Sequence, residues 1–524
     1  MFTTISKRDR SDQSRAWETD EQMVKQRQPV SGSAGQPIKM QESRPISEGC
    51  RDKSKKSTVQ THVWRWKKDR VTIATMCFLG IAFILGSFHS AEAACNTYYV
   101  STSGNDGNPG TISSPWRTLN KASGKVAACD MVYVRGGIYA EAINIRASGT
   151  ASAPIRISGY PGELPTIDGQ GRYPTSNWAS LVNLIGNYIV MSGFEVRNTS
   201  NYNAMGVVLY GHHNRVSSVN VHHTHQNGIL IKGDYGVVEN CSVWQASKVN
   251  VNGGSTQGWS SGLSAARDAV NGLTDNAVMR GNTVFDNWGE GFSTFEANGT
   301  IMENNVVYDN WSANTYISDA RNVIFKDNLV YTTPNNSVNK KSMLLQMSDE
   351  VSSKPRSANN AVINNMFFRG DIAAFTWTGV PGSGLVNALI ANNTIVNGTI
   401  FTGSIMQGSS ILNNIVFRND NGVLARVATR SGLSLSNNLW SSTPPTNASG
   451  AGDIIGDPKL TRTGSTAAGQ LTKNYFGLSL NSPAVNKGGL VLKVIGNYLI
   501  TSQGKTLNIG AYTANLPIEF VATP

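Results

Sequence analysis

The chain has 524 residues, with 45 Lys+Arg against 34 Asp+Glu and a formal charge of +11. Hydrophobic residues make up 40%, which is enough for a large core and too little for a polytopic membrane protein. The first 70 residues hold 16 basic and 9 acidic side chains, which leaves 29 basic and 25 acidic side chains for the rest. Because most of the chain is near neutral, we expect no nucleic-acid partner.

An apolar segment between a basic flank and a run of small residues indicates export. Residues 1–70 are predicted to be a basic, disordered leader, and residues 71–94 a signal peptide or a membrane anchor. A secretory signal has this order of basic, apolar and small residues. An anchor is the alternative, because residues 71–88 can just span a bilayer. We therefore expect a secreted, periplasmic or cell-surface protein that meets a membrane only through this segment.

Three cysteines follow this segment, at positions 95, 129 and 241. Cys95 precedes the apolar residues 98–100, and Cys129 precedes the apolar residues 132–134. Two neighbouring strands could bring this pair together in an oxidising compartment, so we predict a disulfide. Cys241 falls at a core position of the repeat described next and is predicted to be a small buried hydrophobe.

A six-residue repeat, apolar-x-small/polar-x-x-apolar, organises the middle of the chain. Its ten copies begin at Met191, Val216, Val238, Met279, Met302, Phe325, Val362, Ile390, Ile411 and Leu435. The fourth position advances by 25, 22, 41, 23, 23, 37, 28, 21 and 24 residues. Such short strands cannot bury an apolar face alone but form a continuous core when stacked. The alternation and the β-branched residues exclude amphipathic helices as the unit.

Two columns of side chains follow from the stack. Asparagines at equal places in successive turns are predicted to form a ladder of side-chain amides. The residue after each repeat forms a second column, which we interpret as a structural aromatic stack: His222, Trp244, Phe285, Tyr308, Tyr331, Phe368, Val396 and Phe417.

From about residue 181 to residue 440 the repeats resemble a right-handed parallel β-helix of the pectate-lyase-like superfamily. Residues 98–119 and 132–139 are similar to the N-terminal cap module of secreted bacterial β-helix proteins, and residues 457–460, 481–485 and 508–512 resemble their C-terminal closing segment. The resemblance implies an all-β fold, with the cap and first turns over 95–180, β-helix repeats over 181–442 and the closing segment over 443–524. It implies little about chemistry, since the superfamily holds lyases, hydrolases, epimerases and adhesins.

One column of the predicted stack gathers carboxylates. Alignment of the second strand of each turn gives the column Gly233, Asp268, Glu296, Asp319 and Asp349, beside the column Lys232, Arg267, Phe295, Ser318 and Ser348. Stacked carboxylates repel, so they need a cation, a basic neighbour or a raised pKa. Calcium suits such oxygen ligands, and Asp268, Glu296, Asp319 and Asp349 are the predicted set. Turn-capping hydrogen bonds and surface ion pairs are the alternative.

The resemblance also implies roles for the basic neighbours. In calcium-dependent pectate lyases of this fold, a cation or an arginine neutralises the uronate carboxylate, and a lysine or arginine removes the C5 proton. Their acidic motif is not matched residue by residue here, so only the type of site carries over. Lys232 and Arg267 are the predicted catalytic residues.

The insertion 245–276 is long enough to wall a cleft beside this column. Trp259, Trp288, Glu290 and Trp311 are predicted to bind substrate there, the tryptophans by stacking on sugar rings, although Trp288 and Trp311 could equally be structural. Five of the seven histidines lie between His212 and His225. Zinc would need three converging ligands, and a patch of polar turn residues is the alternative that we favour.

These observations favour an exported, monomeric, carbohydrate-active protein with calcium as its one expected cofactor. We expect a polysaccharide lyase that cleaves an acidic, uronate-containing polysaccharide by β-elimination. An epimerase or glycoside hydrolase on the same fold, or a non-catalytic envelope protein that binds glycan or acts as an adhesin, are the alternatives.

Overall fold

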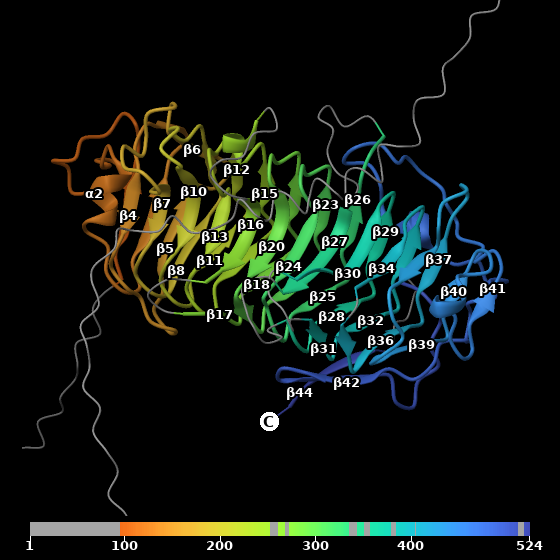
Figure 1. Ribbon diagram of the computed structural model, residues 1–524. Coiled ribbons are helices and arrows are strands. Elements are labelled where there is room, and N and C mark those ends of the chain that lie inside the picture. Colours follow the sequence, from red (N-terminus) through yellow and green to blue (C-terminus); the bar gives the residue numbers. More distant parts are fainter. Residues whose placement is uncertain are drawn as a thin grey trace, which may run out of the picture. The chain divides into compact units, whose positions relative to one another are not determined.

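The computed structural model describes residues 95–251, 260–267, 272–334, 343–349, 357–378, 384–403, 405–511 and 518–523. The predicted leader, the predicted export segment, Trp259 and Asp268 lie outside these ranges. In the described part of the chain, three long parallel sheets run side by side, as Figure 1 shows. Each turn of the chain contributes one strand to each sheet, so the fold is a parallel β-helix.

The first sheet contains thirteen strands in the order β1 (Thr97–Val100), β2 (Met131–Val134), β5 (Ile155–Gly159), β8 (Ile189–Ser192), β11 (Arg215–Ser217), β14 (Val237–Glu239), β18 (Val278–Arg280), β22 (Ile301–Glu303), β25 (Ile324–Lys326), β28 (Ala361–Ile363), β32 (Leu389–Ala391), β36 (Ser409–Leu412) and β39 (Leu433–Ser436).

The second sheet also contains thirteen strands, in the order β3 (Gly137–Tyr139), β6 (Pro165–Asp168), β9 (Glu195–Arg197), β12 (Asn220–His222), β15 (Ser242–Trp244), β19 (Thr283–Phe285), β23 (Val306–Tyr308), β26 (Leu329–Tyr331), β29 (Met366–Phe368), β33 (Thr394–Val396), β37 (Ile415–Phe417), β40 (Leu439–Trp440) and β41 (Ile454–Ile455).

The third sheet contains eleven strands, in the order β4 (Ile143–Ile145), β7 (Ser180–Leu184), β10 (Met205–Leu209), β13 (Ile229–Ile231), β16 (Ser261–Ala266), β20 (Glu290–Phe295), β24 (Thr315–Ser318), β27 (Met343–Asp349), β30 (Asp371–Thr378), β34 (Ile400–Thr402) and β38 (Ala425–Val427). Two small parallel pairs, β17 (Thr274–Asp275) with β21 (Ala297–Asn298) and β31 (Leu385–Val386) with β35 (Met406–Gln407), lie outside these sheets.

The corner between the first and second sheets has a constant length. Its third repeat position is left-handed in all ten copies, from Gly193 at φ 72° and Ser218 at φ 53° to Asn437 at φ 53°. Glycine and asparagine tolerate this conformation best, which explains why small and polar residues recur there. The chain therefore turns within two residues and places the fourth position inside the helix.

Buried asparagines fill this inward position in seven copies. The Nδ2 of each donates to the Oδ1 of the next, over 2.9 to 3.1 Å, along the series Asn282, Asn305, Asn328, Asn365, Asn393, Asn414 and Asn438. The last six amide oxygens, from Asn305 to Asn438, each accept from both the side chain and the backbone N–H of the preceding asparagine, as when Asn328 Oδ1 accepts from the backbone N–H of Asn305 at 2.9 Å. The predicted ladder is confirmed. In the copy before it, Cys241 is buried in the core, and burial raises the pKa of its thiol to about 12.

The predicted aromatic column lies on the outer side of the second sheet. Successive rings from His222 through Trp244, Phe285 and Tyr308 to Tyr331 stack with centroids 4.3 to 5.8 Å apart. Stacking continues the strand register, which pairs each of these residues with the next. The structural interpretation of the column is confirmed.

A short helix and a disulfide lie at the start of the solenoid. Helix α2 (Leu119–Ser123) begins after Thr118, whose side chain accepts a hydrogen bond from the backbone N–H of Lys121, and Leu119 and Ala122 pack into the core. The predicted disulfide is present: it joins Cys95 to Cys129, next to the paired strands β1 and β2. No helix in the described part of the chain is both long and apolar enough to cross a membrane.

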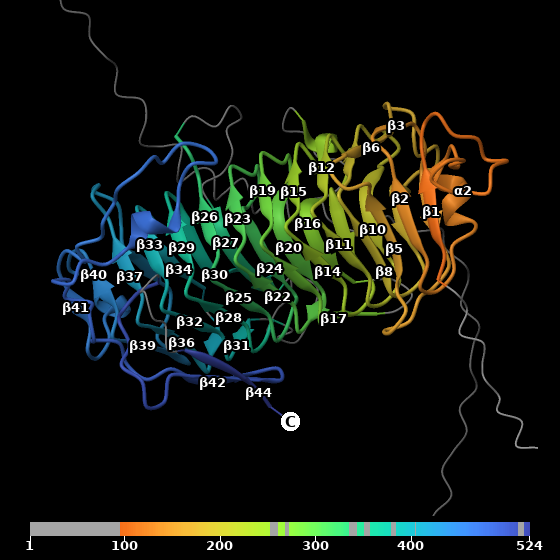
Figure 2. The same cartoon turned by 180° about the vertical axis from the view of Figure 1, so that it is seen from behind.

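The C-terminal segment folds back along the outside of the solenoid. Leu460, Leu471 and Phe476, the last of these in the turn η3 (Lys473–Phe476), pack on outward side chains of the second sheet. The antiparallel strands β42 (Leu492–Ile495), β43 (Tyr498–Thr501) and β44 (Glu519–Ala522) pack on β25, β28, β32 and β36 of the first sheet, and Figure 2 shows β42 and β44 along the same side as β36. The segment thus covers two faces of the last turns. Two further 3-10 turns are η1 (Lys248–Asn250) and η2 (Thr446–Ala448).

Candidate functional site

An arginine and three acids gather where the strands of the third sheet end. Ala266 pairs with Phe295, and Phe295 with Ser318, which pairs with Ser348. The residues that come next after these paired positions therefore form one column: Arg267, Glu296, Asp319 and Asp349. The predicted column placed Asp268 beside Glu296, which is wrong by one residue: Arg267 occupies that place, because Leu263 pairs with Phe292 and both strands run on for the same length.

Arg267 is bonded to the next acid of the column. Its Nη1 donates to Oε2 of Glu296 at 2.9 Å, and the side chain of Arg267 is 52% exposed while that of Glu296 is 7% exposed. A nearly buried carboxylate thus holds one side of a guanidinium whose side chain is half exposed. This is the arrangement expected of a group that receives an anion.

The other two acids are buried. Asp319 accepts a hydrogen bond from the Ser318 hydroxyl at 2.8 Å, and its backbone N–H donates to Ser348 at 3.1 Å. Asp349 is fully buried at the end of β27. Glu296 and Asp319 both have left-handed backbone, with φ of 46° and 49°, so these acids also shape the turn.

The structure describes three of the four predicted calcium ligands, Glu296, Asp319 and Asp349. Among the residues that the structure describes, no three His, Cys, Asp or Glu side chains converge as metal ligands. Glu296 is bonded to Arg267, Asp319 and Asp349 are buried, and calcium binding stays a prediction. Asp268, the fourth predicted ligand, lies outside the described residues.

Lys232 lies on the outer side of the same sheet, one turn earlier. Because Ile231 pairs with Ala265, Lys232 lies opposite Ala266 and next to the position that pairs with Arg267. Its Nζ is 5.4 Å from the ring centroid of Tyr210. The two predicted catalytic residues therefore directly follow neighbouring strands, β13 and β16, near the same edge of the sheet.

Glu290 lies at the opposite end of strand β20. It is buried and its Oε2 accepts from the Ser261 hydroxyl at 3.1 Å, while Ser261 also bonds Ser293 at 2.6 Å. Trp288 and Trp311 directly follow Asn287 and Asn310, whose side chains are bonded at 2.8 Å, so the two indoles occupy equal places in successive turns. Both indoles are partly exposed, as sugar stacking requires. Trp259 lies outside the described residues.

A second polar site involves histidines that the sequence assigned to a turn patch. His222 bonds Glu195 at 2.8 Å, and Arg197 bonds both Glu195 and Asp168, at 3.1 and 2.9 Å. Burial opposes ionisation of Glu195, but hydrogen bonds with His222 and Thr166 and the charge of Arg197 hold its pKa below the ordinary value. Beside this network, His223 and His225 line a cavity of about 230 Å³. The clustering of histidines in the sequence was the signal for this site.

Residues 98–324 match the family described as "Pel9A-like, right handed beta helix region". The chain therefore has a right-handed parallel β-helix fold, as predicted, and resembles the pectate-lyase-like proteins over these residues. The chain is 30% identical over 162 residues to the uncharacterized protein YwoF of Bacillus subtilis, and 42% identical over 74 residues to pectate lyase PEL9 of Emericella nidulans. These alignments span 30% and 14% of this chain, and only 34% and 18% of the two relatives.

Solved structures with a similar course of the chain include two lyases. Pectate lyase Pel9A is 18% identical, with a TM-score of 0.49 over 81% of this chain and 98% of its own. An alginate lyase from Paenibacillus sp. str. FPU-7 is 16% identical, with a TM-score of 0.42 over 64% of this chain and 99% of its own.

Proposed function

We propose that the protein is an exported polysaccharide lyase that cleaves an acidic, uronate-containing polysaccharide by β-elimination. The observation that carries this proposal is the half-exposed guanidinium of Arg267, fixed by the buried Glu296 and adjacent to Lys232. The match to the Pel9A-like family and the local identity to a pectate lyase support the same class of reaction.

The proposed reaction uses two cationic side chains. A uronate carboxylate binds the exposed N–H groups of Arg267, which withdraws charge and makes the C5 proton more acidic. The unprotonated amine of Lys232 removes that proton. The electron pair then forms the C4–C5 double bond as the C4–O bond breaks, and the oxygen of the leaving sugar takes a proton from water. No step of this proposal uses a metal, and calcium dependence remains a separate prediction.

The full chain should be incubated with pectate, alginate and glycosaminoglycans, each with calcium and with a chelator. A lyase produces an unsaturated sugar that absorbs ultraviolet light. New reducing ends without that absorbance would instead show a hydrolase, and a changed sugar configuration without cleavage an epimerase. Retention of glycan without any product would show a binding protein, and each of these three results contradicts the proposal. Loss of product with the chelator alone would establish calcium dependence.

A further inference from the structure

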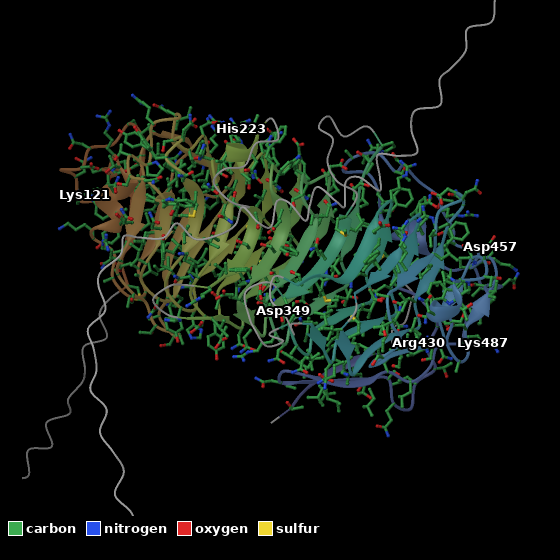
Figure 3. All side chains as sticks on the ribbon, in the orientation of Figure 1. Lys121, His223, Asp349, Arg430, Asp457 and Lys487 are labelled. Carbon is green, nitrogen blue, oxygen red and sulfur yellow. A yellow bond between two sulfur atoms is a disulfide. The ribbon has the colours of Figure 1, made fainter. Side chains whose placement is uncertain are left out.

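The cavity beside the second sheet is built by four successive turns. It is lined by residues that follow β6, β9, β12 and β15, among them Gln170, Asn198, Thr199, His223, His225 and Lys248. Figure 3 shows His223 at one edge of the solenoid and Asp349 at the other. The third-sheet strands run between these edges, so the cavity lies across that sheet from the Arg267 column.

Backbone hydrogen bonds hold the lining residues in place. The backbone N–H of His225 donates to the Thr199 hydroxyl at 2.8 Å, and the carbonyl of His225 accepts from Val249 at 3.0 Å. The backbone N–H of Lys248 donates to Thr224 at 3.1 Å. Turn η1, which contains Lys248, is thereby fixed against the preceding turn, so the cavity walls are preformed.

The charge of the cavity favours an anion. Among its described lining residues Lys248 is the charged group and none is a carboxylate. The neighbouring acids Glu195 and Asp168 both bond Arg197, and Asp168 also accepts from Asn198 Nδ2 at 3.1 Å. His225 Nδ1 is buried and has no hydrogen-bond partner among the described residues, so this polar atom is unsatisfied by the chain.

We propose that this cavity binds a uronate unit of the polysaccharide, with the sugar carboxylate on Lys248 and its hydroxyls on Asn198, Gln170 and the imidazoles. This inference rests on the proposed function for the identity of the ligand. It adds an anchoring subsite that is separate from the Arg267 column. Burial and the charges of His222, Lys248 and Arg197 lower the pKa of His223, and burial and Lys248 lower that of His225, so both imidazoles are neutral hydrogen-bonding groups at neutral pH.

Calorimetric titration of the full chain with a galacturonate trimer tests the subsite. Lys248→Met should weaken binding at least tenfold, whereas Lys487→Met, which changes an exposed lysine elsewhere, should leave it unchanged. The methyl-esterified trimer should bind the wild-type protein and Lys248→Met equally. Equal affinity of wild type and Lys248→Met for the charged trimer would overturn the inference.

Histidine NMR signals locate the bound sugar. On addition of the trimer, the Cε1–H signals assigned through His223→Gln and His225→Gln should shift, and the pKa of both imidazoles should rise because a carboxylate then lies near them. Unchanged signals at saturation would place the sugar elsewhere and overturn the inference. Binding here without any cleavage would contradict the lyase proposal alone, and cleavage with an unaffected Lys248→Met would contradict the subsite alone.

Discussion

Arg267 and Glu296 are a single ion pair whose position depends on one residue of strand register. Glu296 is nearly buried and Arg267 is half exposed, so the carboxylate orients the guanidinium while solvent reaches it. The sequence contained the signal for this pairing, since Gly262-Leu263 and Gly291-Phe292 begin the two strands alike. Alignment from the strand ends missed it because the insertion 245–276 conceals where β16 begins.

Replacement of Arg267 tests its role in catalysis. We expect Arg267→Met to lower kcat/KM for the cleaved polysaccharide on the order of 100-fold, because a group that stabilises developing negative charge is lost. The matched control is Arg280→Met, since Arg280 is also half exposed and paired with a buried glutamate, at 2.9 Å. Initial rates of ultraviolet absorbance measure both variants. An equal loss of kcat/KM in Arg267→Met and Arg280→Met would show only a general effect of removing a positive charge.

The Glu195 network predicts an acid-dependent stability. Because the folded-state pKa of Glu195 is lowered, its carboxylate stabilises the fold above its ordinary pKa of about 4.5 and loses this contribution as the pH falls through the folded value. Glu195→Gln should therefore reduce stability at pH 7 and make its fall below pH 4.5 less steep. Urea unfolding across pH measures this, with Glu519→Gln, an exposed acid, as the control. If the free energy of unfolding depended on pH in the same way for wild type and Glu195→Gln, the prediction would be wrong.

At the scale of elements, the asparagine ladder and the aromatic column were predictable because successive turns repeat them. The C-terminal segment was predictable only as a closing segment. Its docking on two outer faces depends on side chains such as Phe476 that lie in no repeat. The histidine cavity likewise combines residues from four turns, and no single stretch of sequence contains it.

Asn328 lies within the ladder, and its side chain has four hydrogen bonds to neighbouring turns. It donates to Met302 and Asn365 and accepts from the main chain and side chain of Asn305. Asn328→Ala should reduce the free energy of unfolding by about 2–4 kcal/mol, because buried partners are left unpaired. Asn419→Ala, at an exposed position, should change it by less than about 0.5 kcal/mol. Urea unfolding measures the free energy of unfolding of both variants. A decrease for Asn328→Ala as small as that for Asn419→Ala would contradict the prediction.

Phe476 anchors the C-terminal segment on the second sheet, where it is fully buried. Phe476→Ala should cost about 3–5 kcal/mol of local stability and release the segment before the solenoid unfolds. Limited proteolysis should then cut between residues 456 and 511 while the far-ultraviolet circular dichroism is retained. If the far-ultraviolet circular dichroism were lost together with the protection of the segment from proteolysis, the segment and the solenoid would unfold as one unit.

At the scale of the whole molecule, each turn contacts mainly its neighbours, so stability is a sum of local terms. The N-terminal end depends on the Cys95–Cys129 disulfide, which closes a loop of 34 residues. Removal of both cysteines should cost about 2–4 kcal/mol, confined to the first turns. Hydrogen exchange should accelerate in β1 and β2 and stay unchanged in β23 to β29. Uniform acceleration along the chain would contradict this nearest-neighbour description.

The constant corner between the first and second sheets also determines where the chain tolerates insertions. Strand side chains alternate sides, so one added residue at this corner would turn the inward residues of the following strand outward. Both long intervals between repeats, of 41 and 37 residues, leave the corner unchanged and place their extra residues at the other two corners. Those two corners are therefore the places where binding loops of new length can be grafted, with the β-helix core left as a fixed scaffold.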